Sequence, residues 1–267
     1  MKKVLTIAGS DSCGGAGIQA DLKTISALGA YGMSVICAVT AQNTLGVTAV
    51  QEISKEIVEA QIRAIFDDIS VDSVKIGMVS NSEIIKTIKA LLVEYEVTNI
   101  ILDPVMISKS GYYLLRPEAI DALKDLIGIA HIVTPNIPEA EELTGMKISC
   151  EQDMKNAAIK IAELGAKNVL IKGGHCPTNS TDILYYNGES ISFESKRIET
   201  INTHGTGCTL SSAIATYIAK GYSTAHSVKL GKEYINTTIE NSFSIGHGVG
   251  PVGHFINLYK KAGVKYD

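Results

Sequence analysis

Three features are missing from this sequence, and each absence excludes a class of protein. No apolar run approaches the roughly 20 residues that a membrane-spanning helix needs. The net charge is −4 with no stripe of lysine and arginine, so neither a membrane nor a nucleic acid is expected as a partner. The five cysteines form no C-x-x-C pair and no zinc-like spacing, which is typical of a reducing compartment. Residues 1–8 lack a signal peptide's long apolar core and cleavage site, so we expect a cytoplasmic location.

The composition is that of a globular α/β protein. Of the 267 residues, 45% are hydrophobic and 19% are charged, which allows a substantial core. Short β-rich apolar runs alternate with helix-length segments, and this alternation predicts right-handed crossovers and a mostly parallel sheet. We expect strands at 4–8, 35–40, 74–76, 100–102, 132–134 and 169–171, and helices at 57–69, 83–93, 118–127, 139–144 and 153–164.

The pattern becomes antiparallel after residue 182. Residues 183–186 and 190–193 flank Asn187-Gly188, a strong hairpin turn signal, so we expect the sheet to end in an antiparallel edge hairpin. Further helices are expected at 210–219, 225–240 and 255–261. Because no repeat or interdomain linker interrupts the chain, residues 1–267 are predicted to form one domain. In such sheets ligands bind beyond the carboxyl ends of the strands.

Residues 202–211, Asn-Thr-His-Gly-Thr-Gly-Cys-Thr-Leu-Ser, join a strand-like run to an Ala-rich helix. The first amides of a helix have no intrahelical partner, and the helix dipole adds positive charge there. Gly205 and Gly207 carry no Cβ, so an anion can approach the backbone beside Thr206 closely. Cys208 falls in or beside the first turn, where the same field favours a thiolate. An anion hole beside an ionisable residue is what phosphoryl transfer needs.

Two other interpretations of this segment stay open. The cysteine could be a buried structural residue after a glycine-rich turn, because free cysteines often pack as small hydrophobes. Alternatively, Cys208 could be a covalent nucleophile with His204 as its base. Two residues this close in a helix-opening turn seldom face each other, which disfavours the second interpretation.

The glycine-rich stretch 9–17 follows the first expected strand. It is not a P-loop, because Gly15-Ala16 stands where Lys-Ser/Thr is required. It matches a loose dinucleotide pattern, but no carboxylate closes the next strand, so a nicotinamide enzyme is discounted. In the helix that follows, Asp21 falls among the packed positions, and a carboxylate there needs a ligand or a partner such as a helix terminus or a lysine.

Polar residues follow the next two strands. Gln42 and Asn43 are amides that can both donate and accept, which suits the edge of a heteroaromatic ring; the alternative is a turn amide that bonds local backbone. Met78 follows the strand at 74–76, where a pocket-lining role is plausible although methionine is more often core.

The later strand ends carry charge. Asp103 precedes Pro104 and is well placed for a metal–phosphate site, and residues 106–111, with Lys109, form a polar segment that could be a lid. Asn136 and Glu139 form a helix-capping signature, a sufficient structural explanation to which a role near Mg²⁺ would be additional. Lys172 could place an ammonium over phosphates or be a solvated lysine.

Together these motifs resemble the ribokinase-like superfamily, and closely its hydroxymethylpyrimidine/phosphomethylpyrimidine kinase branch of thiamine biosynthesis. The resemblance covers nearly the whole chain. It rests on residues 6–11 (Thr-Ile-Ala-Gly-Ser-Asp), 14–21 (Gly-Gly-Ala-Gly-Ile-Gln-Ala-Asp), 40–43 (Thr-Ala-Gln-Asn), 103–106 (Asp-Pro-Val-Met), 134–136 (Thr-Pro-Asn), 172–175 (Lys-Gly-Gly-His) and 203–209 (Thr-His-Gly-Thr-Gly-Cys-Thr).

The resemblance implies a three-layer α/β/α sandwich and assigns roles residue by residue. It implies that Gly205, Thr206 and Gly207 form the anion hole, with Cys208 where many sugar-kinase relatives carry an aspartate base. It places six residues around the pyrimidine: Gly9, Asp21, Gln42, Met78, Val105 and Cys208. It places five near Mg-ATP: Asp103, Asn136, Glu139, Lys172 and Lys109, with Asp103 and Glu139 at Mg²⁺ directly or through water. Tyr112-Tyr113 departs from the family pattern and leaves the lid's contacts open.

The implied activity is ATP-dependent phosphorylation of 4-amino-5-hydroxymethyl-2-methylpyrimidine and then of its monophosphate. Some pyridoxal kinases share the glycine-rich start and the Gly-Cys ending, so a pyridoxal or dual-specificity kinase is the alternative, and Gln42 is the discriminating residue. A pyrimidine-binding module without catalysis and a cysteine hydrolase are remoter possibilities. Family likeness also suggests a homo-oligomer, such as a dimer, and leaves a monovalent cation open as a further cofactor.

Overall fold

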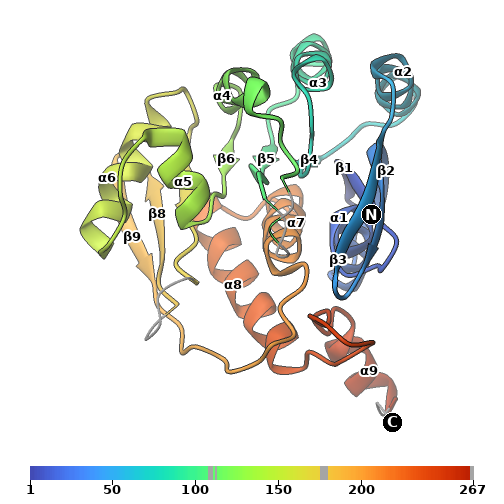
Figure 1. Cartoon of the computed structure of the whole chain (residues 1–267), viewed down its shortest axis with the longest axis vertical. Coiled ribbons are helices and arrows are strands. Elements are labelled where there is room, and N and C mark those ends of the chain that lie inside the picture. The colour runs from blue at the N-terminus through green and yellow to red at the C-terminus, as the bar shows by residue number, and fades with distance from the viewer. Residues whose placement is uncertain (108–110, 112, 175–179, 265–267) are drawn as a thin grey trace.

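The computed structural model describes residues 1–107, 111, 113–174 and 180–264 (Figure 1). Its strands are β1 (Lys3–Asp11), β2 (Tyr31–Asn43), β3 (Gly46–Glu52), β4 (Ser73–Ile76), β5 (Ile100–Leu102), β6 (Ile132–Val133), β7 (Val169–Ile171), β8 (Asp182–Tyr186) and β9 (Glu189–Phe193). Its helices are α1 (Gly17–Ala27), α2 (Lys55–Phe66), α3 (Ser82–Glu94), the 3₁₀ helix η1 (Pro117–Ala119), α4 (Ile120–Ile127), α5 (Ile137–Thr144), α6 (Glu151–Ala162), α7 (Thr206–Ala219), α8 (Thr224–Glu240) and α9 (Ile256–Ala262).

All of these strands form one sheet in the order β3-β2-β1-β4-β5-β6-β7-β8-β9. The central strands β2, β1, β4, β5, β6 and β7 are parallel, β3 is antiparallel to β2, and β8 and β9 are antiparallel at the other edge. The predicted mostly parallel sheet with an antiparallel edge hairpin is confirmed. At the hairpin turn Asn187 and Gly188 both have positive φ, 52° and 83°, as a type I′ turn requires.

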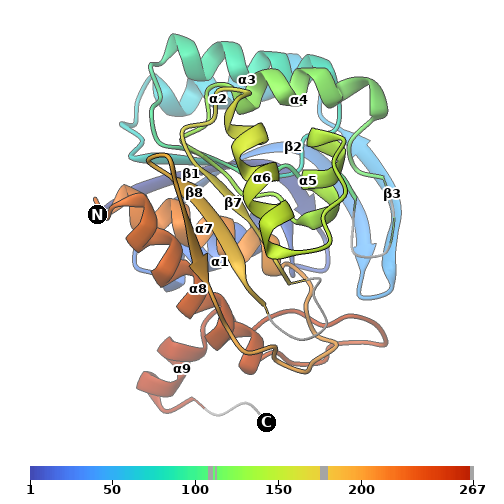
Figure 2. The ribbon, with the colours of Figure 1, turned by 90° about the vertical axis from the view of Figure 1, so that its left-hand side faces the viewer.

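Helices cover both faces of the sheet, which gives the expected three layers. Helices α2 to α4 lie on one side of the strands and α1, α7 and α8 on the other in both views (Figures 1 and 2). Successive residues of β1 belong to opposite layers because side chains alternate along a strand. Leu5 belongs to the same core cluster as Ile88 of α3, whereas Val4 belongs to the cluster that contains Ile214 of α7. No helix in the described part of the chain is long and apolar enough to cross a membrane.

The second antiparallel edge was not anticipated. The expected strand 35–40 is the middle of β2, which runs from Tyr31 to Asn43, and residues 46–52 return beside it as β3. These residues carry a weak signal because β3 is an edge strand, half-exposed on both faces, and therefore lacks the continuous apolar run of the central strands.

Candidate active site

The functional side chains gather where the parallel strands end. Asp11 and Asn43 are the last residues of β1 and β2, while Asp103 and Lys172 directly follow β5 and β7. Because these strands are parallel, their carboxyl ends meet at one edge of the sheet. The start of α7 lies at the same edge, since Gly207 approaches both Asp103 and Lys172.

Helix α7 begins in a turn that only glycine fits. Gly205 is its N-cap, with φ 78° and ψ 11° in the left-handed region. A Cβ at Gly205 would lie 1.7 Å from the carbonyl oxygen of Gly15, so the two glycine loops touch backbone to backbone. The carbonyl of Gly205 accepts the Thr209 amide at 2.9 Å, and the Thr206 amide donates to the Thr203 carbonyl at 3.4 Å, so the Gly207 and Cys208 amides are the ones that the helix start offers to an anion. The predicted turn and helix start are confirmed, while their binding of an anion stays a prediction.

An aspartate–lysine pair lies beside this helix start. The Nζ atom of Lys172 donates to Oδ1 of Asp103 at 2.7 Å, and the Thr134 and Ser211 hydroxyls contact the same carboxylate at 3.3 and 3.4 Å. A Cβ on Gly207 would lie 3.4 Å from both Asp103 and Lys172. Only 14% of the Lys172 side chain is exposed, so the interpretation as a solvated lysine is wrong.

The predicted capping box at the start of α5 is confirmed, and it adds a third charged group. Oδ1 of Asn136 accepts the Glu139 amide at 2.9 Å, and Oε2 of Glu139 accepts the Asn136 amide at 2.8 Å. Burial raises the pKa of Glu139, with the Asp103 carboxylate acting in the same direction and the Lys172 ammonium against it. Burial would lower the pKa of Lys172, but the Asp103 and Glu139 carboxylates outweigh it and raise that pKa.

A cleft of about 1250 Å³ opens in front of these groups. Its polar lining residues include Asn136, Glu139, Lys172 and the helix-start residue Thr206. Its apolar lining residues include Leu210 from α7 and Ile235 and Ile239 from α8.

Cys208 lies between two helix starts. The amide of Gly17, the first residue of α1, hydrogen-bonds its sulfur, and α7 begins two residues before it. Burial nevertheless raises the pKa of the Cys208 thiol to about 11, although the Lys75 ammonium and the Gly17 amide act in the opposite direction. The predicted shift of Cys208 toward the thiolate is therefore wrong for this structure, because desolvation outweighs the favourable field.

Asp21 lies underneath the site. Its carboxylate accepts Lys75 Nζ at 2.9 and 2.8 Å, Thr6 Oγ1 at 2.6 Å and Ser212 Oγ at 2.7 Å, and both Asp21 and Lys75 are fully buried. The alternative that Asp21 serves a lysine is confirmed. Because these donors occupy the carboxylate, its direct contact with a substrate is unsupported here and stays a prediction.

The remaining predicted pocket residues line the end of the sheet near the glycine loops. A Cβ on Gly9 would lie 2.9 Å from the sulfur of Met78, so these two residues touch. Gln42 contacts His204, whereas Asn43 accepts the Leu45 and Gly46 amides and is therefore the turn amide of the alternative interpretation. Val105 follows Asp103, whose carbonyl accepts its amide at 2.8 Å.

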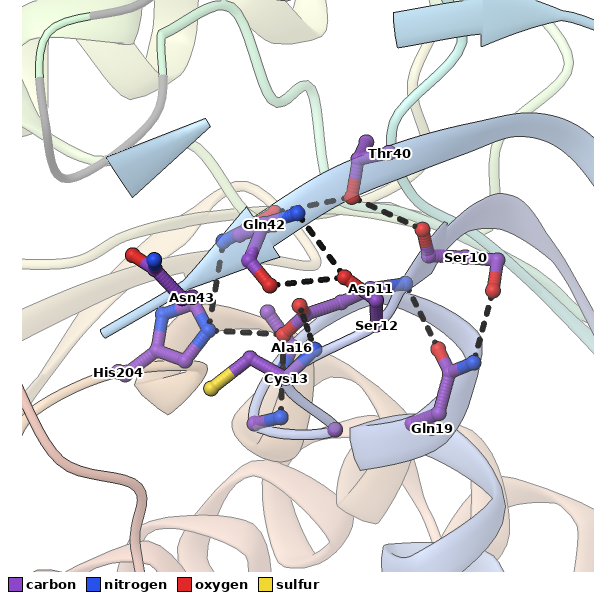
Figure 3. Close-up of polar contacts among 12 residues, drawn as sticks. Ser10, Asp11, Ser12, Cys13, Ala16, Gln19, Thr40, Gln42, Asn43 and His204 are labelled. Atoms are coloured by element: carbon purple, nitrogen blue, oxygen red, sulfur yellow. Dashed lines mark hydrogen bonds and ion pairs between the residues drawn. The ribbon is translucent and has the colours of Figure 1, made fainter. Parts of the chain in front are cut away.

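Sequence reasoning did not pair the buried charges with one another, and two of these pairs lie next to predicted pocket residues. Lys75 interrupts the apolar strand 74–76, and that misplaced charge is the signal that could have paired it with Asp21. His204 Nε2 contacts Asp11 Oδ2 at 2.8 Å across 193 residues, and no local pattern announces such a distant contact (Figure 3).

The ligand atoms of Asp11, Cys13 and His204 lie within 4.8 Å of one another, as a metal site requires. However, Asp11 already accepts backbone amides from Cys13, Gly15 and Ala16 as well as His204. A carboxylate with four donors has little capacity left for a cation, so no metal is assigned to this cluster.

Several predicted residues lie outside the described part of the chain. They are Lys109 with Ser108 and Ser110, which make up half of the expected lid, and also Tyr112 and His175. Their predicted roles stay predictions.

The sequence model of the family described as phosphomethylpyrimidine kinase matches residues 11–253, which is most of the chain and contains the site. This chain belongs to the phosphomethylpyrimidine kinase family. It is therefore a kinase, a phosphotransferase, and its fold is the ribokinase-like fold that its motifs resemble.

The names of curated relatives agree with this family assignment. The chain is 46% identical to the hydroxymethylpyrimidine/phosphomethylpyrimidine kinase of Bacillus subtilis over 95% of this chain and 94% of that protein. It is 49% identical to the thiamine biosynthesis bifunctional protein ThiED of Geobacter sulfurreducens, over 95% of this chain but only 52% of that longer protein.

Solved structures that are similar to this chain include both a phosphomethylpyrimidine kinase and pyridoxal kinases. A phosphomethylpyrimidine kinase from Clostridium difficile is 53% identical, with a TM-score of 0.80 over 88% of this chain and 98% of that one. An ADP complex of Bacillus subtilis pyridoxal kinase is 39% identical, with a TM-score of 0.89 over 95% of this chain and 97% of that one. The fold therefore does not separate the two substrates.

Proposed function

We propose that this kinase transfers a phosphoryl group from ATP to the hydroxymethyl oxygen of 4-amino-5-hydroxymethyl-2-methylpyrimidine, and then a second one to the resulting monophosphate. The observation that carries the proposal is the convergence at Gly207 of a helix start and the Asp103–Lys172 pair, with Cys208 next along the helix. Phosphoryl transfer depends mostly on positioning and on stabilising charge, and this convergence supplies both.

The nucleotide is assigned to the cleft in front of that convergence. Its lining offers Lys172 and the start of α7, with the Gly207 and Cys208 amides, to the phosphates, and the apolar side chains of Ile235 and Ile239 offer a surface for a purine ring. Lys109 and Asn136 are kept as further phosphate-binding residues. A kinase in the same structural group has been solved with an ATP analogue: the Staphylococcus aureus pyridoxal kinase with AMP-PCP and pyridoxal.

Asp103 and Glu139 would hold Mg²⁺, and the geometry favours contact through water. The Asp103 carboxylate is committed to Lys172, and Glu139 caps the Asn136 amide, so neither offers a fully free oxygen pair for direct coordination. Mg²⁺ retains several waters and is usually held by one or two carboxylates plus substrate phosphates, which fits this donor set. Bound there, the ion would neutralise phosphate charge. A monovalent cation as a further cofactor stays a prediction.

The substrate is assigned to the side of the site that holds Gly9, Gln42, Met78, Val105 and Cys208, with Asp21 as a supporting residue beneath it. Only the first of the two steps has a proton to remove, because a phosphate monoester is already ionised near pH 7. Cys208 is proposed as the group that assists this removal. Its neutral thiol makes the assistance depend on pH.

Pyridoxal is the competing substrate, and the similarity of pyridoxal kinase structures keeps dual specificity open. One coupled assay decides: ADP release is measured with the aminopyrimidine alcohol and with pyridoxal in parallel. The proposal predicts a clearly higher kcat/KM for the pyrimidine. ADP release with pyridoxal alone would contradict it, and pyrimidine binding without ADP release would reduce the chain to a binding module.

The helix start is tested by enlarging Gly207. A single methyl at this position would lie in ordinary contact, 3.4 Å from Asp103 and Lys172, so Gly207→Ala is the tolerated control. Gly207→Val fills the space assigned to the phosphate and should lower single-turnover rates of both steps, by about 10²–10³-fold if the oxyanion contacts are lost. Unchanged rates in Gly207→Val would mean that the phosphate binds elsewhere.

A homodimer and a cytoplasmic location are expected from family likeness and from the sequence, and both stay predictions, as does the single-domain boundary 1–267. Sedimentation equilibrium of the purified chain tests the first of these.

A further inference from the structure

The Asp11 carboxylate fixes a proton on His204. It is nearly fully buried and accepts the Cys13 amide at 2.8 Å, the Gly15 amide at 3.0 Å and the Ala16 amide at 2.8 Å (Figure 3). Burial alone would raise the pKa of Asp11, but these hydrogen bonds and the one from His204 lower it, so the group is an anion at neutral pH. An anion 2.8 Å from Nε2 of His204 requires a donor there. Nε2 therefore carries a proton, whether the ring is neutral or charged.

The side-chain amide of Gln42 lies between that ring and Thr40. One end of the amide is 3.4 Å from Nε2 of His204, and the other end is 3.2 Å from Oγ1 of Thr40 (Figure 3). When the Gln42 side-chain nitrogen points toward His204, its N–H faces the N–H at Nε2 of the ring, so two donors meet without an acceptor. Thr40 has a single hydroxyl proton, and the carbonyl of Ser10, 3.0 Å away, is its acceptor. Thr40 therefore has a lone pair to offer Gln42 rather than a second proton.

A half-turn of the Gln42 amide about its last torsion removes both conflicts. The amide oxygen then faces the Nε2 proton of His204, which it shares with the nearer Asp11 carboxylate, and the amide nitrogen donates to Thr40. The two ends of an amide have nearly the same shape, so the turn changes no packing. The Gln42 backbone does not need to move, because Ser12 holds it in place. The Ser12 hydroxyl donates to the backbone carbonyl of Gln42 at 2.7 Å and accepts from the backbone N–H of Gln42 at 2.9 Å.

We propose that His204, held by Asp11, is a positioning residue that keeps the oxygen of the Gln42 side chain toward itself and the nitrogen toward Thr40, and so determines which ring edge the site accepts. This inference rests on the proposed function, in which Gln42 meets the pyrimidine. His204 acts through Gln42 and touches no reacting atom.

The fixed orientation of the Gln42 side chain determines which ring edge of a substrate it can hydrogen-bond. Its oxygen keeps one lone pair and its nitrogen keeps one proton for the substrate. An aminopyrimidine offers an amino donor next to a ring-nitrogen acceptor, so the amino group pairs on the His204 side and the ring nitrogen on the Thr40 side. The 4-oxo analogue of the same alcohol presents the reverse order, a carbonyl acceptor next to a ring N–H donor. A fixed amide mispairs with it twice, whereas a freely turning amide accepts either ring.

The kinetic experiment compares the amino and the 4-oxo alcohols in three proteins. The wild type should prefer the amino alcohol in kcat/KM by about tenfold or more for each mispaired contact. His204→Met removes the donor at similar size, so the preference should fall by about tenfold or more as the oxo analogue gains. His204→Gln places an N–H close to the position of Nε2 and should restore most of the preference. Equal losses for both alcohols in His204→Met, with an unchanged ratio, would overturn the proposal, because a merely structural residue acts on both alike.

A second measurement needs no substrate. Nuclear Overhauser contacts of the Gln42 side-chain NH₂ in isotope-labelled wild-type protein should connect it to the methyl group of Thr40, and nitrogen shifts should report a protonated Nε2 on His204. Contacts from that NH₂ to the His204 ring protons would overturn the proposal. If the wild type phosphorylates neither alcohol, the proposed function fails, while the NMR result still decides how the amide is held.

Discussion

Two of the aspartate–lysine pairs near the carboxyl edge of the sheet, Asp21–Lys75 and Asp103–Lys172, differ in access. The Asp21–Lys75 pair is sealed, with neither side chain exposed. The Asp103–Lys172 pair is open on one side, since Lys172 lines the cleft and keeps 14% of its side chain exposed. Both pairs contain the same chemical groups, yet only the second can meet a ligand without rearrangement.

Neighbouring serines of α7 connect the helix to both pairs. Ser212 donates to Asp21 at 2.7 Å, whereas Ser211 reaches Asp103 only at 3.4 Å. Every donor to Asp21 lies within 2.9 Å, so that carboxylate is fully used. Asp103 has one short contact, at 2.7 Å to Lys172, and therefore keeps acceptor capacity. We infer that the first pair supports the fold and the second serves the reaction.

Breaking the sealed pair should have the largest effect on stability. Lys75→Met leaves Asp21 as a buried anion without its cation, and breaking a buried pair in this way costs about 3–5 kcal/mol in the free energy of unfolding. Urea denaturation measures the loss. The control is the double variant Asp21→Asn with Lys75→Met, whose neutral amide can accept from one of the Thr6 and Ser212 hydroxyls and donate to the other, and which should recover most of the stability. A loss below about 1 kcal/mol in the single variant would place this pair with surface ion pairs instead.

Breaking the open pair should affect catalysis more than stability. Lys172→Met removes the ammonium assigned to the phosphates and should lower kcat/KM for ATP by about 10²–10³-fold, as the loss of an oxyanion contact does. Its free energy of unfolding should fall by less than that of Lys75→Met, because Lys172 lines the cleft, so water can take the place of its ammonium beside Asp103. Lys172→Arg is the control that keeps the charge. A stability loss equal to that of Lys75→Met with intact kinetics would remove the distinction between the pairs.

Cys208 lies between the two pairs and should give the site its pH dependence. Because the pKa of Cys208 is about 11, the thiolate fraction below that pH grows about tenfold for each unit by which the pH rises. If the thiolate takes the alcohol proton, the first phosphorylation should accelerate about a hundredfold from pH 7 to pH 9, while the second stays flat. Cys208→Ala should abolish the rise. A wild-type first step that is equally fast at both pH values would exclude the thiolate as the base.

The sequence predicted the layers well and the long-range pairs poorly. Buried parallel strands and amphipathic helices leave periodic patterns, so β4, β5 and β7 were recognised nearly to the residue. The start of α7 and the capping box of α5 were recognised because their signals are local.

What sequence reasoning could not reach depends on contacts between distant residues. The Asp11–His204 contact joins segments 193 residues apart, and the Lys75 partner of Asp21 lies 54 residues away, where its charge marks a buried ion pair but does not tell which acid completes it. The protonation of Cys208 was predicted in the wrong direction because local sequence shows the helix dipole but not the burial.

The most direct test of the central claim is a crystal structure of the kinase with a non-hydrolysable ATP analogue, Mg²⁺ and the aminopyrimidine alcohol. The account predicts that γ-phosphate oxygens lie about 3 Å from the Gly207 and Cys208 amides and from Nζ of Lys172. Terminal phosphates bound away from the start of α7, with Lys172 still directed only at Asp103, would contradict it.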